Sequence, residues 1–223
     1  MAGNRRPLRY AACMVLYYVH DPMCSWCWAF RPVWGQLREA LLAEAPQLQI
    51  VTLLGGLAAD SDAPMSQSLQ AEIRRHWQTI QRVVPGTAFN FDFWTSCEPR
   101  RSTFPACRAV IAAGMQGEEA EAKRLEECMV LAIQQAYYMH ARNPSDESLL
   151  VHLAADIGLH SARFQSDLHA DATQRRLAQE IELARRIGAQ GFPSLIVASH
   201  GDYHVVPVDY LDAAPMREQI LSL

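Results

Sequence analysis

Two cysteines separated by two residues, in the run Cys-Ser-Trp-Cys at residues 24–27, constrain the fold of this chain more than any other feature. They follow an apolar stretch at residues 11–19 that is rich in aromatic and β-branched side chains. Apolar residues at helical spacing then continue to residue 45. We therefore expect a buried strand, a short turn and a long helix in succession, with the cysteine pair at the start of the helix. Two thiols in that position can form a disulfide with little backbone movement.

The position of the pair predicts different roles for the two thiols. Cys24 would face the unpaired N–H groups and the positive end of the helix dipole, which favour thiolate over thiol. Cys27 lies one turn further along, so we expect it to be more buried. We therefore predict that Cys24 is the nucleophile and that Cys27 resolves the mixed disulfide. Ser25 and Trp26 lie closest to the charged sulfur and bring no positive charge, which predicts a moderately stabilised thiolate.

A Cys-x-x-Cys pair can instead be half of a zinc site, which needs four ligands. The sequence contains no second pair of this kind, Cys97 and Cys107 are too widely spaced to form one, and only His20 is close in sequence. We therefore expect no metal. Cys13, Cys107 and Cys128 lie in apolar patterns and are predicted to be small buried hydrophobic residues.

The remaining pattern predicts one α/β layer with a helical lid. A second strand at residues 48–54 would complete a β-α-β unit with parallel strands. Residues 64–188 show helical periods almost throughout, apart from a loop at residues 84–98. Strand character returns only as a hairpin, before a last helix. The hairpin strands are predicted at residues 194–198 and 203–206, and the last helix at residues 210–221.

These elements divide the chain into three parts. Residues 8–60 and 189–223 would form the two parts of the α/β layer, and residues 61–188 an inserted helical subdomain. Within the insertion, Ser145 to Glu147 resemble a helix start and Gly158 its stop, and another helix is expected at residues 173–187.

Composition excludes several classes of function. A chain of 223 residues that is 50% hydrophobic can bury a substantial core. Its net charge of −4 and the absence of a basic stripe argue against a nucleic-acid partner.

No apolar run reaches the roughly 18 residues of a membrane-spanning helix. Arg5, Arg6 and Arg9 before the first apolar run imitate a secretory leader, but no small-residue cleavage site follows, so we expect a cytoplasmic protein with reduced thiols.

A second motif, Gly-Phe-Pro-Ser at residues 191–194, leads directly into the predicted hairpin. Together with the cysteine pair, it makes the chain resemble the thioredoxin superfamily and, within it, the DsbA-like oxidoreductases of the FrnE type. The resemblance covers the whole chain. The other matching segments are Asp21-Pro22, residues 54–57, and, less specifically, residues 105–109 and 136–138.

The resemblance implies a thioredoxin-like fold with a large inserted all-helical subdomain. It also implies that Pro193 is cis and lies beside the sulfurs, and that the backbone of Phe192 can pair with an extended substrate. Ser25 and Trp26 would complete the substrate-binding residues, and the insertion would cover the cleft. Trp28 would either join Trp26 and Phe192 in an apolar rim or pack in the core, and for Trp28 and Phe30 we favour the core.

The function that the resemblance implies is a thiol–disulfide oxidoreductase, either a disulfide reductase or an isomerase, that uses no cofactor. Its partners would be protein or small-molecule disulfides, with glutathione as a further candidate. The same fold also serves glutathione-dependent transferases and isomerases, such as 2-hydroxychromene-2-carboxylate isomerases, but those relatives use a single serine or cysteine, so Cys27 favours dithiol chemistry. A non-enzymatic chaperone on this scaffold is the third hypothesis.

Overall fold

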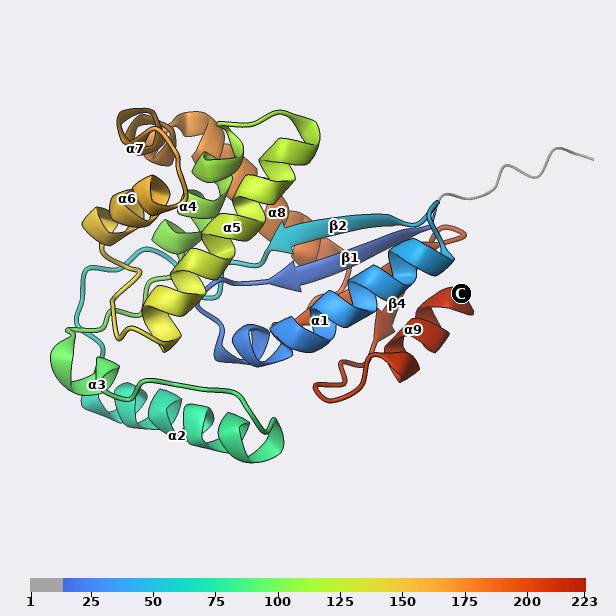
Figure 1. Cartoon of the computed structure of the whole chain (residues 1–223), viewed down its shortest axis with the longest axis horizontal. Coiled ribbons are helices and arrows are strands. Elements are labelled where there is room, and N and C mark those ends of the chain that lie inside the picture. Colours follow the sequence, from blue (N-terminus) through green and yellow to red (C-terminus); the bar gives the residue numbers. More distant parts are fainter. Residues whose placement is uncertain (1–13) are drawn as a thin grey trace, which may run out of the picture.

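The computed structural model describes residues 14–223, which build a mixed four-stranded sheet with helices on both of its faces (Figure 1). The strand order is β2-β1-β3-β4. β1 (Val15–His20) pairs in parallel with β2 (Gln49–Leu54) and antiparallel with β3 (Ser194–Ser199), which forms a hairpin with β4 (Asp202–Val206). The predicted β-α-β unit and hairpin are therefore confirmed.

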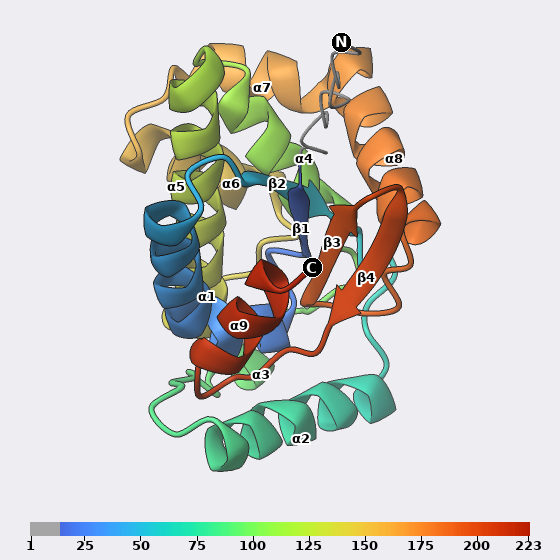
Figure 2. The ribbon, with the colours of Figure 1, turned by 90° about the vertical axis from the view of Figure 1, so that its right-hand side faces the viewer.

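The two central strands, β1 and β3, are buried on both faces because a helical layer covers each side of the sheet (Figure 2). Leu16 and Tyr18 of β1 pack with the long helix α1 (Ser25–Glu44) and the last helix α9 (Ala214–Leu221). Val19, on the opposite side of the pleat, packs with the end of α8 (Asp171–Arg186). This two-sided burial explains why the first strand is an almost continuous apolar run instead of an alternating one.

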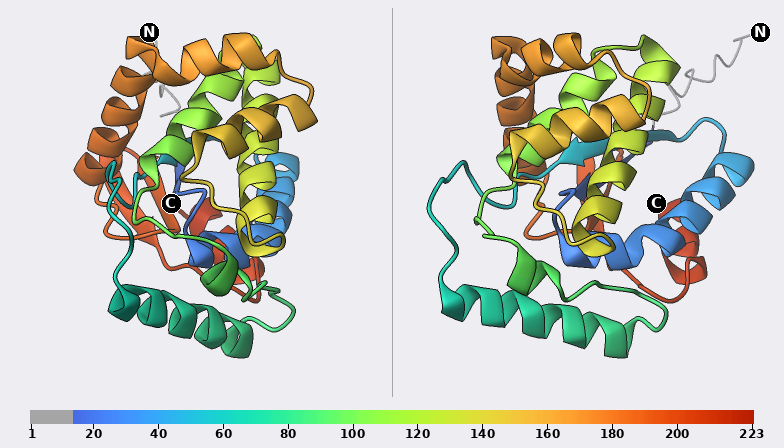
Figure 3. Two further views of the ribbon diagram at one scale, coloured as in Figure 1. Left: turned by 90° about the vertical axis from the view of Figure 1, so that its left-hand side faces the viewer. Right: turned by 60° about the vertical axis from the view of Figure 1, so that its left-hand side comes forward.

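The insertion contains a bundle around α4 and a separate helix, α2, on the opposite side of the molecule (Figure 3). α4 is buried on nearly all sides because its residues are mostly small, so neighbouring helices pack closely against it. α2 is held by Trp77, which is buried against a group of aromatic rings. The helices of the insertion before α8 are α2 (Gln67–Val83), α3 (Phe93–Ser96), α4 (Phe104–Gly114), α5 (Glu119–Tyr138), α6 (Glu147–Asp156) and α7 (Ser161–His169).

The thioredoxin-like fold with a helical insertion is confirmed, and the domain boundaries stay predictions. α8 lies inside the range assigned to the insertion, yet it packs against β2 of the sheet. No helix within residues 14–223 is long and apolar enough to cross a membrane. The arginines that imitate a leader, Cys13 and the start of the first predicted strand lie outside the described residues.

Several local predictions were wrong. The loop expected at residues 84–98 contains α3. The last helix starts at Ala214, because Asp209 accepts hydrogen bonds from the backbone of the following turn and so holds residues 209–213 out of the helix. Leu42, predicted on the apolar face of α1, is 44% exposed.

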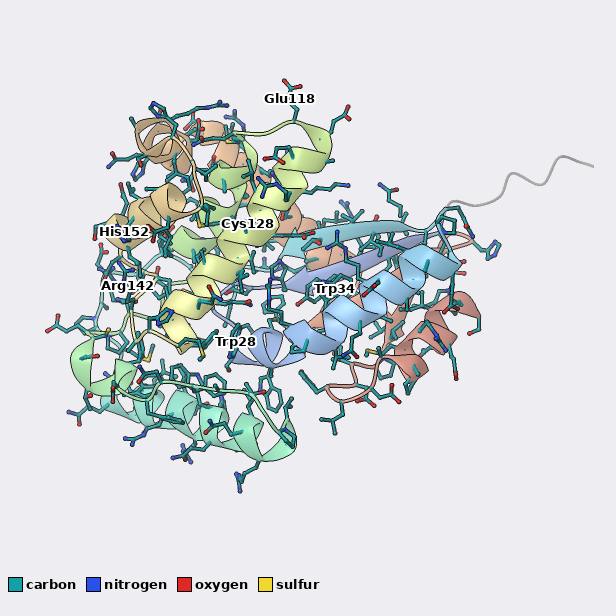
Figure 4. All side chains as sticks on the ribbon, viewed as in Figure 1. Trp28, Trp34, Glu118, Cys128, Arg142 and His152 are labelled. Atoms are coloured by element: carbon teal, nitrogen blue, oxygen red, sulfur yellow. The ribbon has the colours of Figure 1, made fainter. Side chains whose placement is uncertain are left out.

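Of the predicted buried thiols, Cys107 is fully buried. Cys128 is only half buried midway along α5 (Figure 4), where its sulfur lies 3.7 Å from the Arg124 guanidinium.

Candidate active site

Cys24 lies at the carboxyl end of β1, immediately before the first residue of α1. A short turn fixes this position, because the backbone N–H of Cys24 donates to the carbonyl of Asp21 (3.1 Å) and the N–H of Met23 donates to Asp21 Oδ1 (2.8 Å). Cys24 has extended backbone angles and occupies the N-cap position without a side-chain capping bond. Cys24 therefore occupies the expected position at the start of the helix, where the first backbone N–H groups have no partner within the helix.

The loop before β3 is distant in sequence from Cys24 but lies next to its sulfur. Cys24 Sγ donates to the carbonyl oxygen of Phe192 at 3.4 Å, across 168 residues of sequence. The contact follows from the sheet register, since Val19 at the end of β1 pairs with Ser194 at the start of β3. The Phe192–Pro193 peptide bond is cis, and Pro193 is buried.

The second thiol is the more buried of the pair, with Cys27 1% exposed and Cys24 7% exposed. Burial raises the pKa of the Cys27 thiol well above its usual value, and the adjacent Cys24 raises it further. Tyr210, from the segment before α9, packs its ring 5.0 Å from that of Trp26. Cys27 is therefore protected from direct reaction with solvent-borne disulfides, as a resolving thiol would need to be.

A buried carboxylate lies directly behind the cysteine turn. Asp21 is fully buried, and its Oδ2 accepts hydrogen bonds from the N–H of Leu57 (2.8 Å), the hydroxyl of Thr103 (2.7 Å) and the thiol of Cys107 (3.5 Å). Burial raises the pKa of Asp21, although these donors act in the opposite direction. Because Thr103 and Cys107 belong to the start of α4, Asp21 ties the insertion to the cysteine turn. The sequence marked Asp21 only as a turn residue, since its partners are distant in the chain.

His20, the last residue of β1, is a second buried polar group, which the sequence had suggested only as a zinc ligand that lacked partners. It is 4% exposed, and its ring stacks on Tyr18 at 5.0 Å. Burial lowers the pKa of His20 to about 4, and the nearby Arg31 cation lowers it as well. The imidazole is therefore neutral at physiological pH.

A cleft of about 460 Å³ opens in front of Cys24. Ser25, Trp26 and Phe192, the residues proposed from the sequence to bind substrate, line it on the side of the sheet. The insertion and α8 supply its remaining walls. The charged and aromatic lining residues from those segments are Glu72, His76, Trp77, Arg101, Tyr137 and Arg185.

Trp28 does not line the cleft and packs instead against the core of the insertion, which was the favoured expectation for this residue. Its side chain extends from the first turn of α1 (Figure 4) and stacks on Tyr138 of α5, with ring centroids 5.6 Å apart. Trp28 Nε1 also donates to the carbonyl of Ala88 at 3.0 Å. Trp28 therefore anchors the insertion to α1.

The other described cysteines lie outside the cleft. Cys97 Sγ donates to the carbonyl of Ala141 at 3.0 Å, and Cys107 Sγ contacts Asp21. The sequence assigned no redox role to either thiol.

Comparison with known proteins agrees with this geometry. The family described as thioredoxin matches residues 17–206. A candidate protein disulfide isomerase from Nitrosomonas europaea is 29% identical, with a TM-score of 0.76 over 94% of this chain and 96% of that one. The cytosolic disulfide reductase DsbM from Pseudomonas aeruginosa is 24% identical, with a TM-score of 0.70 over 93% and 97% of the two chains. DsbM has also been solved with GSH.

One relative is named as an adapter protein and not as an oxidoreductase. The ClpXP adapter protein SpxH from Halalkalibacterium halodurans is 22% identical over 99% of this chain and 73% of its own length.

Proposed function

This chain belongs to the thioredoxin family and is DsbA-like, and we propose that it is a dithiol enzyme that reduces or isomerises disulfides, with Cys24 as nucleophile and Cys27 as resolving thiol. The observation that carries the proposal is the asymmetry of the pair. Cys24 lies at the helix start and lines the cleft, whereas Cys27 lies one turn deeper and is almost fully buried.

In the first step, the Cys24 thiolate attacks one sulfur of the substrate disulfide. A bond forms between Cys24 Sγ and that sulfur, the substrate S–S bond breaks, and the second substrate sulfur leaves as a thiolate that takes up a proton. Ionisation of Cys24 would free the carbonyl of Phe192 from its present contact with the thiol. That carbonyl could then accept a hydrogen bond from an extended substrate backbone, with Ser25 and Trp26 beside it.

In the second step, Cys27 loses its proton and attacks Cys24 Sγ. The mixed disulfide breaks, the remaining substrate thiol leaves, and the enzyme retains a Cys24–Cys27 disulfide, so two electrons have passed from enzyme to substrate. The raised pKa of Cys27 keeps it protonated until the mixed disulfide has formed. An external thiol such as glutathione would return the pair to the dithiol.

Reduction in the cytoplasm is the direction we favour. The Cys-Ser-Trp-Cys motif contains no histidine or lysine that would make the pair a strong oxidant. DsbM, whose fold this chain shares, is described as a cytosolic disulfide reductase, and the direction proposed here is the same.

The test compares three serine variants by the equilibrium redox potential against glutathione and by turnover of a model disulfide. Cys24→Ser should lose the reversible couple and at least about 1,000-fold of turnover, because the nucleophile is gone. Cys27→Ser should also lose the couple but accumulate a mixed disulfide on Cys24, detectable by mass spectrometry. Cys128→Ser is the matched control, since this half-exposed thiol lies outside the cleft, and it should retain both properties.

Full turnover in Cys27→Ser would instead support the glutathione-dependent transferase or isomerase hypothesis, because a single thiol would then suffice. The description of SpxH favours a second candidate, a protein-binding adapter. Binding of a protein partner that survives the combined replacement of Cys24 and Cys27 would support that function.

A further inference from the structure

We propose that the cleft selects small anionic disulfides and that Arg101 and Arg185 determine this specificity by binding substrate carboxylates. The inference rests on the proposed function, because it names the substrate class of the same site. Arg101 lies in the segment between α3 and α4, and Arg185 lies in the last turn of α8. Both line the cleft that contains Cys24.

In the described part of the chain, both arginines that line the cleft have guanidinium groups without a protein partner, whereas the equally unpaired Arg186 does not line it. Within residues 14–223, neither the Arg101 nor the Arg185 side chain forms an ion pair or a hydrogen bond. By contrast, Arg100 pairs with Asp146, and Arg176 pairs with two glutamates at 2.6 and 2.7 Å. A guanidinium presents several fixed donors that match a carboxylate, so unpaired arginines beside a reactive thiol are suited to bind an anionic ligand.

The other charged residues that line the cleft restrict the class of ligand further. Glu72 is the only acidic side chain in the lining, and His76 lies one turn after it on α2. Two arginines and one carboxylate complement a molecule that carries two carboxylates and one ammonium group. A short peptide thiol such as glutathione has this set of charges at neutral pH, and a cleft of about 460 Å³ is within the usual size range of small-ligand sites.

The anionic substrate would react as the proposed function requires. Cys24 attacks one sulfur of glutathione disulfide and releases one glutathione thiol, and Cys27 then displaces the second. The enzyme dithiol loses two electrons and two protons, and the disulfide gains them. No further reductant is needed for this single turnover.

The test follows single-turnover oxidation of the pre-reduced protein by three disulfides of different charge. Glutathione disulfide is anionic, 2-hydroxyethyl disulfide is neutral and cystamine is cationic. Arg101→Glu and Arg185→Glu should each lower the ratio of the rate with glutathione disulfide to the rate with the neutral disulfide about tenfold or more, because a charge-assisted contact to the substrate carboxylate is lost. The corresponding ratio for cystamine should rise. Arg101→Lys and Arg185→Lys should retain part of the preference.

Arg186→Glu is the matched control. It makes the same change in net charge at the next position of α8, but Arg186 is exposed and does not line the cleft. Equal effects of Arg185→Glu and Arg186→Glu would overturn the proposal, and so would an unchanged ratio of glutathione disulfide to cystamine rates in both cleft variants. In either case, reaction with the neutral disulfide would leave the proposed function intact, whereas wild-type protein that reacts with none of the three would overturn both.

Discussion

The two sides of the cleft are built in different ways. On the sheet side, Cys24 and Phe192 lie at the ends of adjacent strands, and backbone pairing between β1 and β3 sets their separation. On the insertion side, α2 and Tyr137 are positioned by side-chain packing around Trp77, whose ring lies 5.5 Å from that of Tyr137. The difference indicates that strand pairing positions Cys24 and Phe192, whereas side-chain packing positions the opposite wall of the cleft, which determines which ligands can enter.

Asp21 connects the sheet side of the cleft to the insertion side, so its replacement should have the largest effect on the stability of the protein. Asp21→Ala would leave two backbone N–H groups and the Thr103 hydroxyl buried without their acceptor. We expect the free energy of unfolding to fall by about 3 to 5 kcal/mol, measured by urea denaturation. The exposed Asp202 on β4 is the control, and Asp202→Ala should change stability by less than about 0.5 kcal/mol. Similar losses in the two variants would show that Asp21 does not link the two sides.

The sheet side should also carry a pH dependence of stability through His20. Its pKa in the folded protein is about 4, below the usual 6.5, so the unfolded chain binds the proton more readily. The contribution of His20 is therefore fully present above pH 6.5 and lost as the pH falls toward 4, by about 3 kcal/mol.

Comparison of wild type with His20→Gln should isolate this effect, since the buried acids Asp21 and Glu180 have raised pKa values and act in the opposite direction. Urea denaturation between pH 4 and 7 gives the measurement. The control is His140→Gln, at an exposed position, which should follow the wild-type curve. A pH-independent difference between wild type and His20→Gln would contradict the expectation.

Gly55 offers a sharper test of the sheet side, because a Cβ atom at this position would lie 1.8 Å from the Phe192 ring. Gly55→Ala must therefore displace Phe192, whose carbonyl contacts Cys24. We expect disulfide turnover to fall about tenfold. Gly35→Ala is the control, since its Cβ meets no atom within 4 Å on an exposed face of α1, and it should retain turnover while gaining up to about 1 kcal/mol of stability. Unchanged turnover in Gly55→Ala would show that the position of Phe192 is not critical.

The smallest effect is expected on the insertion side, at Tyr138. Its hydroxyl is buried without a hydrogen-bond partner, although its ring stacks on Trp28. Tyr138→Phe should therefore leave the unfolding free energy unchanged or raise it by less than about 1 kcal/mol. Tyr138→Leu, which loses the stacked ring, should destabilise by more in the same thermal or urea experiment. A clear loss of stability in Tyr138→Phe would show that the hydroxyl has a partner and that polar contacts also hold this side.

Local patterns predicted the parts of the fold that depend on residues close together in sequence. The strand, turn and helix around Cys24 follow from apolar spacing and from Asp21-Pro22, and the hairpin follows from a short turn at His200-Gly201 with positive φ angles. The same patterns failed for Cys128, which they placed in the core. An aromatic residue or a cysteine on a helix has the same local spacing whether it faces a cleft, a neighbouring helix or solvent.

The sequence by itself determined the place of the cysteine pair at a helix start and the order of strands and helices along the chain, because these depend on spacing within a few helical turns. Only the tertiary structure decided that Phe192 contacts Cys24, that Thr103 and Cys107 contact Asp21, and that Arg101 and Arg185 share the cleft. These groups are separated by tens of residues or more. The contacts between them depend on strand pairing and on the packing of the insertion, which no local pattern of apolar and polar residues specifies.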